Sequence, residues 1–319
     1  MEFSAHVRMR QVHEMEKKRF FVLLSSILLF CGCGDPSPAE GGKPRVTAGL
    51  PPAAHVVRCI AGDRFDVISM LPDGKSPHDY APGPQEIRRA AASRIFFTTG
   101  MPFEERAVKA LSRVKIVDVS RDTRKIPFAA EEHHGHDHDH DHDHDHHHHH
   151  HHGENDPHVW LDADNLVRMA GTVKDELTAL DPAGRAQFEK NYALFAGRIR
   201  EIDGAIAKKL APLKGEALFV YHAAFGYFAH RYGLKQTAVE LGGREVSPSR
   251  LAGVIRKARE AKTKVIFVQP QFNPASCRAL ADAIGGRVAP LDPLAGDVEK
   301  NLLTMADAVN SGFSGGGVK

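Results

Sequence analysis

The sequence lacks the excess of positive charge typical of nucleic-acid-binding proteins and the motifs typical of common hydrolases. The first 32 residues hold five of the 42 Lys and Arg and three of the 40 Asp and Glu, so residues 33–319 carry 37 charges of each sign. This balance gives no support to a nucleic-acid partner. The HExxH motif of zinc peptidases is absent, and neither "GYFAH" nor "GGREVS" makes a nucleophile elbow of the GxSxG type. We therefore expect a binding protein and not an enzyme.

Cysteine is also scarce. Two of the four cysteines, Cys31 and Cys33, lie in the N-terminal leader, which leaves Cys59 and Cys277 for the folded chain. One pair of residues far apart in the sequence does not make a disulfide framework. We expect both to be unpaired, buried thiols.

The leader has an apolar run too short to cross a membrane. Phe20 to Phe30 is eleven residues long, whereas a spanning helix needs about 20. Basic residues precede the run and small residues follow it, which is typical of an export signal beginning at Met1 or at Met15. Gly32-Cys33 resembles the end of a bacterial lipoprotein signal. Residues 1–33 are thus expected to form a signal peptide, with Cys33 as the lipidated residue.

Two groups of short apolar runs alternate with helical segments, and this rhythm predicts parallel sheets covered by helices. In the first group we expect strands at 45–49, 65–70, 94–100 and 115–120, with helices at 51–61, 84–92 and 103–112. In the second group we expect strands at 217–221, 236–241, 264–269 and 287–291, with helices at 224–232, 248–261, 273–284 and 297–309. The predicted fold class is α/β, with two lobes that each contain a four-stranded parallel sheet.

A long amphipathic helix separates the two groups. Asp162 is expected to cap a helix that runs through Leu180, and Asp181-Pro182 to open the next one. The apolar positions of this second helix step by three or four residues and form one stripe: Phe188, Tyr192, Phe195, Ile199, Ile202, Ile206 and Leu210. At about 43 Å, the helix is longer than a simple crossover requires, so we expect it to join two separate bodies rigidly.

These elements divide the chain into consecutive parts. After the signal peptide, the expected parts are a tether at 34–43, an N-terminal lobe at 44–181, a linker helix at 182–211, a C-terminal lobe at 212–312 and a disordered tail at 313–319.

Fourteen of the 21 histidines lie in one run inside the N-terminal lobe. They are His133, His134, His136, His138, His140, His142, His144, His146, His147, His148, His149, His150, His151 and His152. The segment 121–155 around them has no apolar periodicity, which predicts a disordered loop. Ordering such a loop costs about 1–2 kcal/mol per fixed residue. We therefore expect the run to bind several metal ions weakly.

Isolated polar residues lie where a rigid site would form. Ligands of open parallel sheets bind beyond the carboxyl ends of the strands. His78 lies in the loop after the second strand, His158 precedes the helix capped by Asp162, His222 follows "ALFVY", and Asp292 follows "RVAPL". Three imidazoles and one carboxylate suit zinc, although each residue taken singly could instead have a structural role.

The neighbours of two of these histidines support the hypothesis. Pro77 and Asp79 flank His78, and Asp156-Pro157 precedes His158. Proline restricts the backbone, and a carboxylate can hold the second nitrogen of a ligand imidazole. The remaining histidines of the folded chain, His55 and His230, are expected to be structural or surface residues.

Five motifs occur in an order that resembles a known family. "SPHDYAPGP", "DPHVWLD", "YHAAFGYFAHRYGL", "VQPQFNP" and "PLDPLAGD" are similar to the motifs of zinc-binding substrate-binding lipoproteins of bacterial ABC transporters, a cluster that also holds manganese-binding members. The resemblance runs from about residue 45 to 310. It departs at Gln269, where many relatives have an acidic residue, and in "ELGGREVSP".

The resemblance implies two α/β lobes with the metal between them and the ligands His78, His158, His222 and Asp292. Manganese-binding relatives usually have Glu at the position of His222, so an imidazole there favours Zn²⁺ over Mn²⁺. The implied function is high-affinity capture of Zn²⁺ outside the cytoplasm, periplasmic or at the cell surface, and its delivery to a membrane ABC permease and its ATPase. We expect a monomer anchored to the membrane by its lipid.

Other functions stay open at this point. A manganese or broader divalent-metal binding protein, a metal buffer or chaperone, and a surface adhesin would all use the same residues. A zinc hydrolase is disfavoured, because catalytic zinc usually keeps an open position that a fourth protein ligand would close.

Overall fold

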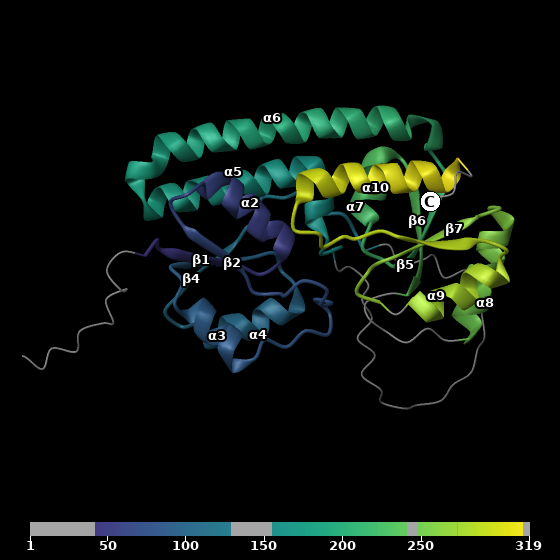
Figure 1. The fold of residues 1–319 in the computed structure, drawn as a ribbon, viewed down its shortest axis with the longest axis horizontal. Coiled ribbons are helices and arrows are strands. Elements are labelled where there is room, and N and C mark those ends of the chain that lie inside the picture. Colours follow the sequence, from purple (N-terminus) through teal and green to yellow (C-terminus); the bar gives the residue numbers. More distant parts are fainter. Residues whose placement is uncertain (1–41, 129–154, 241–247, 273, 315–319) are drawn as a thin grey trace, which may run out of the picture. The chain divides into compact units, whose positions relative to one another are not determined.

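The computed structural model describes residues 42–128, 155–240, 248–272 and 274–314. Within them it contains two parallel four-stranded sheets (Figure 1), as the sequence predicts. The first has the order β2-β1-β3-β4 and the second the order β6-β5-β7-β8. Their strands are β1 (Arg45–Ala48), β2 (Asp66–Ser69), β3 (Ile95–Thr98), β4 (Lys115–Asp118), β5 (Ala217–His222), β6 (Lys235–Glu240), β7 (Val265–Val268) and β8 (Arg287–Pro290).

Helices alternate with the strands in both halves. In both sheets the second strand in sequence pairs with one side of the first and the third strand with the other, so the carboxyl ends of all four strands share one edge. The helices are α2 (Pro51–Ala61), α3 (Pro84–Ala91), α4 (Pro102–Ala110), α5 (Ala163–Leu180), α6 (Arg185–Leu210), α7 (Gly226–Tyr232), α8 (Pro248–Glu260), α9 (Pro274–Ala283) and α10 (Val298–Phe313). None of the helices in the described ranges is long and apolar enough to cross a membrane.

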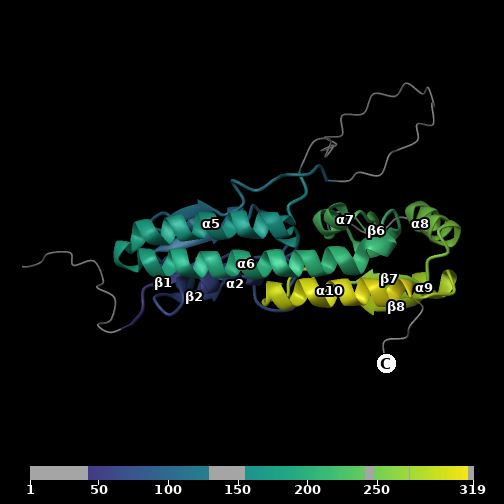
Figure 2. The ribbon, with the colours of Figure 1, turned by 90° about the horizontal axis from the view of Figure 1, so that it is seen from above.

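Helix α6 joins the two halves. It packs against α2 and α5 beside the first sheet and against α10, which follows the last strand of the second sheet; Figure 2 shows α5, α6 and α10 running alongside one another. Its 26 residues span about 39 Å. The apolar stripe predicted from the sequence faces inward: five of its seven residues are buried, and Tyr192 and Ile202 are half-buried against the same core.

The local signals at the start of α5 and α6 act as the sequence predicts, with one shift. The Asp162 carboxylate accepts a hydrogen bond from the Asn165 N–H at 2.9 Å and caps α5. The segment Pro182–Gly184 forms a turn of 3₁₀ helix, so the regular α-helix begins at Arg185 and not at Pro182. Proline is favoured in this first turn because it lacks the N–H that would have no partner there.

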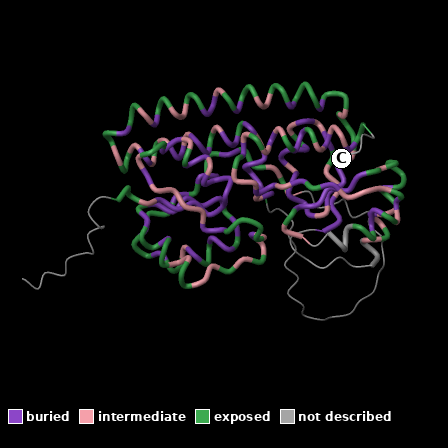
Figure 3. The backbone as a smooth tube through the Cα atoms, viewed as in Figure 1, coloured by how far each residue is buried: buried purple, intermediate pink, exposed green. Residues whose placement is uncertain are grey.

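One hydrophobic core extends through both halves. It runs from Val46 in β1 to Val309 in α10, and α6 contributes Phe188, Phe195 and Ile199 to it. A second cluster, which includes Phe219, Ile266 and Leu280, lies within the second half. Figure 3 shows the buried residues concentrated in the strands and on one side of α6. Helix α10 returns from the second sheet to contact α2 and α6, so packing resists the separation of the two halves.

Candidate metal centre

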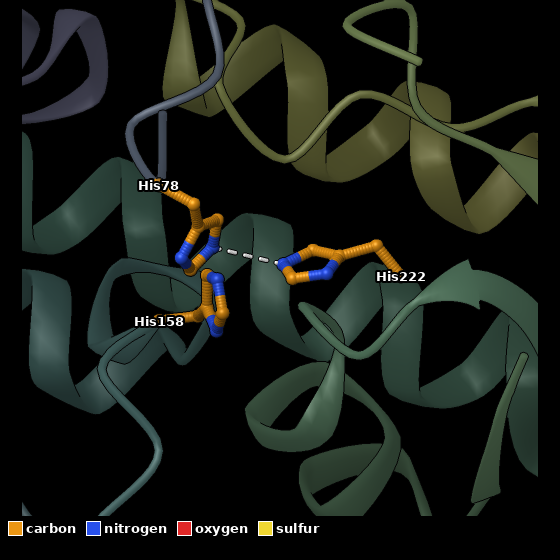
Figure 4. A group of neighbouring side chains, drawn as sticks. All are labelled: His78, His158 and His222. Atoms are coloured by element: carbon orange, nitrogen blue, oxygen red, sulfur yellow. Dashed lines mark hydrogen bonds between the residues drawn. The ribbon is translucent and has the colours of Figure 1, made fainter. Parts of the chain in front are cut away.

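Three of the four predicted ligands meet between the two halves (Figure 4). His78 lies in the loop between β2 and α3, His158 immediately precedes a short 3₁₀ turn at Val159–Leu161, and His222 is the last residue of β5. The backbone of β5 therefore sets the position of His222 directly. The other two rings depend on loops, of which the one carrying His158 is buried.

The three imidazoles are spaced as a shared ion requires. Ligand nitrogens of His78, His158 and His222 all lie within 4.8 Å of one another, and the two Nε2 atoms of His78 and His222 are 3.0 Å apart. In a tetrahedral zinc site with Zn–N bonds of 2.0–2.1 Å, two nitrogens lie roughly 3.3 Å apart. The cavity beside the rings has a volume of only about 10 Å³, roughly the space of one water molecule. The arrangement suits a single ion and leaves no room for an organic substrate.

Burial keeps the rings of His78 and His222 in the form that binds metal. The pKa of His78 is lowered to about 3, first because the ring is removed from water and second because His222 and His158 lie close by. Burial also lowers the pKa of His222, against the opposing effect of its bond to Glu240. A neutral imidazole offers a lone pair, whereas a protonated one does not. Both rings are therefore ready to bind a cation at neutral pH.

Asp156 orients the ring of His158. Its Oδ1 accepts hydrogen bonds from the His158 backbone N–H at 2.9 Å and from ring Nδ1 at 2.7 Å, so ring Nε2 remains for a metal. The backbone of Asp156 is held in turn by the Tyr227 hydroxyl, which donates to its carbonyl at 3.0 Å. Gly226 makes room for the carboxylate, because a Cβ there would lie 2.3 Å from Asp156 Oδ2. This is the role that the sequence suggested for Asp156.

Glu240 orients His222 in the same way, and the sequence analysis did not single it out. Its Oε2 lies 2.5 Å from His222 Nδ1, and both side chains are only 3% exposed. Glu240 is the last residue of β6, in register with His222 at the end of β5. The rule that selected His222, a polar residue at the carboxyl end of a strand, would also have selected Glu240 from "QTAVEL".

Gln269, the departure from the family pattern, braces the end of β5. It is 1% exposed. Its Nε2 donates to the His222 carbonyl at 2.9 Å and its Oε1 accepts from the His222 N–H at 3.4 Å. An amide can donate and accept at once, whereas a carboxylate could only accept. Glutamine at position 269 can therefore pair with both the carbonyl and the N–H of His222.

The loop that carries Asp292 closes the site from the second half. Trp160, two residues after His158, donates from Nε1 to the Pro293 carbonyl at 2.7 Å, and Pro293 and Leu294 line the cavity. Asp292 itself lies outside the group of three ligand atoms. Its Oδ1 accepts from the Leu294 N–H at 2.9 Å and from Gln271 Nε2 at 3.0 Å. Asp292 as fourth ligand stays a prediction.

The remaining predicted sites are only partly described. Cys33 and the run His133–His152 lie outside the described residues, as does the side chain of Cys277. Cys59 is a free, half-buried thiol. His230 is exposed on α7.

The motifs, the two sheets and the three converging imidazoles can be compared with known proteins. A family model described as the periplasmic component A of zinc-uptake complexes matches residues 46–310. The chain belongs to this family. Its membership confirms the resemblance seen in the motifs, and with it a metal-binding substrate-binding protein of the zinc and manganese type.

Named relatives and a solved structure agree with this family. The chain is similar to the high-affinity zinc uptake system protein ZnuA of Yersinia pestis, with 29% identity over 85% of this chain and 88% of the relative. It is 26% identical to the manganese ABC transporter substrate-binding lipoprotein PsaA of Streptococcus mitis, over 78% and 80% of the two chains. A crystal structure of ZnuA superimposes with a TM-score of 0.75 at 28% identity, covering 85% of this chain and 99% of that one.

Proposed function

We propose that this protein captures one Zn²⁺ between its two halves and delivers it to a membrane ABC permease driven by its ATPase. The observation that carries the proposal is the convergence of three imidazoles from three separate segments at a cavity the size of one ion. Each ring comes from a different loop or strand end. The site therefore forms only when the two halves are folded and docked.

The proposed ligands are the three imidazoles together with the carboxylate of Asp292. Asp292 directly precedes Pro293 and Leu294, which line the cavity. To reach the ion, its Oδ1 would exchange hydrogen bonds to Gln271 and Leu294 for a metal bond. Three nitrogens and one oxygen in a tetrahedron suit zinc, whereas manganese prefers a site with more oxygens.

The surroundings of the site favour release without a large hinge motion. Helix α6 contacts elements of both halves, and one hydrophobic core extends through them. Rotation about α6 would break that core. We propose that loading and release instead reorder the loops that carry His78 and Asp292. Of the three rings only that of His78 is half-buried, whereas those of His158 and His222 are buried. The ring of His78 is therefore the most accessible from solvent.

The lipid anchor and the division of the chain into parts complete the proposal. Cys33 is proposed to carry the lipid that anchors a monomeric protein to the outer face of a membrane, with residues 34–43 as a tether to the N-terminal lobe at 44–181. We propose a linker helix at 182–211, a C-terminal lobe at 212–312 and a tail at 313–319, of which Phe313 still belongs to α10. The run His133–His152 is proposed to hold several ions loosely.

The experiment that tests the proposal compares two histidines in protein purified without a tag. His222→Ala removes a buried ring of the site, and His230→Ala removes an exposed histidine as a matched control. Competition calorimetry with a chelator should show a large loss of Zn²⁺ affinity in His222→Ala and wild-type affinity in His230→Ala. Equal affinities in the two variants would refute the assignment. Mn²⁺ binding tighter than Zn²⁺ would assign the site to manganese.

A further inference from the structure

A second group of metal-binding side chains lies outside the three-histidine site. His55 and Cys59 are four residues apart on α2 and so share one face of the helix. Glu299 reaches them from the first turn of α10. Ligand atoms of all three lie within 4.8 Å of one another. The two helices belong to different halves of the chain, and 240 residues separate Cys59 from Glu299.

The distances match the edges of a tetrahedral site. His55 Nε2 lies 3.2 Å from Glu299 Oε2, and Cys59 Sγ lies 3.9 Å from the same oxygen. Bonds of 2.0–2.1 Å to nitrogen and oxygen and 2.3 Å to sulfur would place these pairs roughly 3.3 and 3.5 Å apart. Shifts of a few tenths of an ångström would suffice. Asp297 Oδ1, 3.9 Å from His55 Nε2, offers a fourth ligand.

We propose that His55, Cys59 and Glu299 form a second metal site for a thiophilic divalent cation such as Zn²⁺ or Cd²⁺. A thiolate, an imidazole and a carboxylate are all zinc ligands, and the sulfur disfavours hard ions such as Mg²⁺, Ca²⁺ and Mn²⁺. The side chains of His55 and Glu299 are 19% and 17% exposed, so a cation can reach them from solvent. The site goes beyond the proposed transport function and does not depend on it.

Arg198 makes this site weaker than the first. Its guanidinium, on α6, holds Glu299 Oε1 at 2.5 Å and Oε2 at 3.3 Å. The pair leaves Oε2 shared between the arginine and the cation, and the positive charge opposes a second one nearby. The ion would nevertheless connect α2 to α10, and through Arg198 both of them to α6. The bound ion would therefore link the two halves at a place away from the three-histidine site.

Sulfur ligation supplies a specific signal for the test. The full chain is first given one equivalent of Zn²⁺ and then titrated with Co²⁺, whose bond to a thiolate produces a charge-transfer band in the near ultraviolet. The run His133–His152 contains no cysteine and cannot produce this band. At saturation the band should correspond to one thiolate-bound Co²⁺ per chain in the wild type and in the control Cys277→Ser. Cys59→Ser should lose it.

Variants of the other two ligands test the bridge between the helices. Glu299→Gln and His55→Gln should each raise the Co²⁺ concentration at half-saturation by at least the 10–100-fold that loss of an outer-shell partner costs. If circular dichroism shows that Cys59→Ser does not fold, the two Gln variants serve as the test in its place. His222→Ala, titrated with Co²⁺ without the preceding Zn²⁺, should still produce the band, so failure of the transport site and of this one can be told apart. A saturating Co²⁺ titration with no Cys59-dependent band, or a band indifferent to both Gln variants, would overturn the proposal.

Discussion

Glu240→Gln tests how the protein prepares His222 for its ion. Glu240 is not a proposed ligand, but its Oε2 lies 2.5 Å from His222 Nδ1 at a site where both side chains are 3% exposed. The carboxylate holds the proton on Nδ1, which leaves the Nε2 lone pair for the metal, and its negative charge makes the ring a stronger donor. Glutamine preserves the shape and can still accept from Nδ1–H through its carbonyl oxygen. The substitution therefore removes the charge and keeps the orientation.

The size of the effect follows from that difference. Loss of an outer-shell partner of a metal-binding histidine costs about 10–100-fold in metal affinity, which corresponds to about 1.4–2.7 kcal/mol. Because glutamine retains the hydrogen bond, we expect the lower half of this range. The free energy of unfolding of the metal-free protein should fall by less than the free energy of metal binding, since a buried carboxylate is itself costly to remove from water.

The assay is competition calorimetry of Zn²⁺ against a chelator at fixed pH, with denaturant unfolding of the metal-free protein as the second measurement. Glu201→Gln, on the exposed side of α6, is the matched control for loss of one negative charge. Wild-type affinity in Glu240→Gln, or an equal loss in Glu201→Gln, would refute the reasoning. So would a loss of affinity fully explained by a loss of folding.

Two further predictions concern the histidine run and a buried acid. Deleting 133–152 should remove several weakly bound Zn²⁺ ions and leave one tight ion in a calorimetric titration, because folding has already ordered the three-ring site; no tight ion after deletion would contradict this. Burial raises the pKa of Glu104 from 4.5 to about 7, so between these pH values the folded state keeps a proton that the unfolded state has lost. Glu104 by itself therefore lowers the free energy of unfolding as pH rises through this window, whereas His78 and His222, whose pKa values are lowered, act in the opposite direction. In denaturant unfolding at several pH values, the free energy of unfolding of the wild type minus that of Glu104→Gln should fall between pH 4.5 and about 7. Parallel profiles for the two proteins would show that Glu104 does not titrate as described.

The choice of glutamine at position 104 rests on its contacts. Glu104 Oε2 accepts backbone hydrogen bonds from Thr99, Gly100 and Met101 at 2.8–2.9 Å, and a glutamine carbonyl can accept the same three. The Thr99 hydroxyl, which donates to Oε1 at 3.1 Å, can turn to accept from the new amide. Glu104→Gln thus removes the titrating carboxyl group and leaves none of its hydrogen-bond partners unsatisfied.

Local patterns were enough to predict most of the fold. The alternation of apolar runs and helical segments predicted both sheets, and the stripe from Phe188 to Leu210 predicted a helix with one buried side. Asp162 as a helix cap was likewise readable, because a cap depends on residues only three positions apart. The rule that ligands bind beyond the carboxyl ends of parallel strands selected His78, His158 and His222 as candidate ligands, because those ends lie at one edge of a sheet.

Contacts between distant segments could not be obtained in this way. Periodicity says which side of a helix or strand is buried, but not which residue of another segment it meets there. The pairing of His222 with Glu240 depends on the register of β5 and β6, and the engagement of Asp292 by Gln271 depends on how one loop folds back.

The meeting of Cys59 with Glu299 goes furthest beyond local patterns, because it requires α10 to pack back against α2. Such contacts arise from the burial of the whole core. No short stretch of sequence encodes them, whereas helix caps, apolar stripes and strand ends are local properties of the chain.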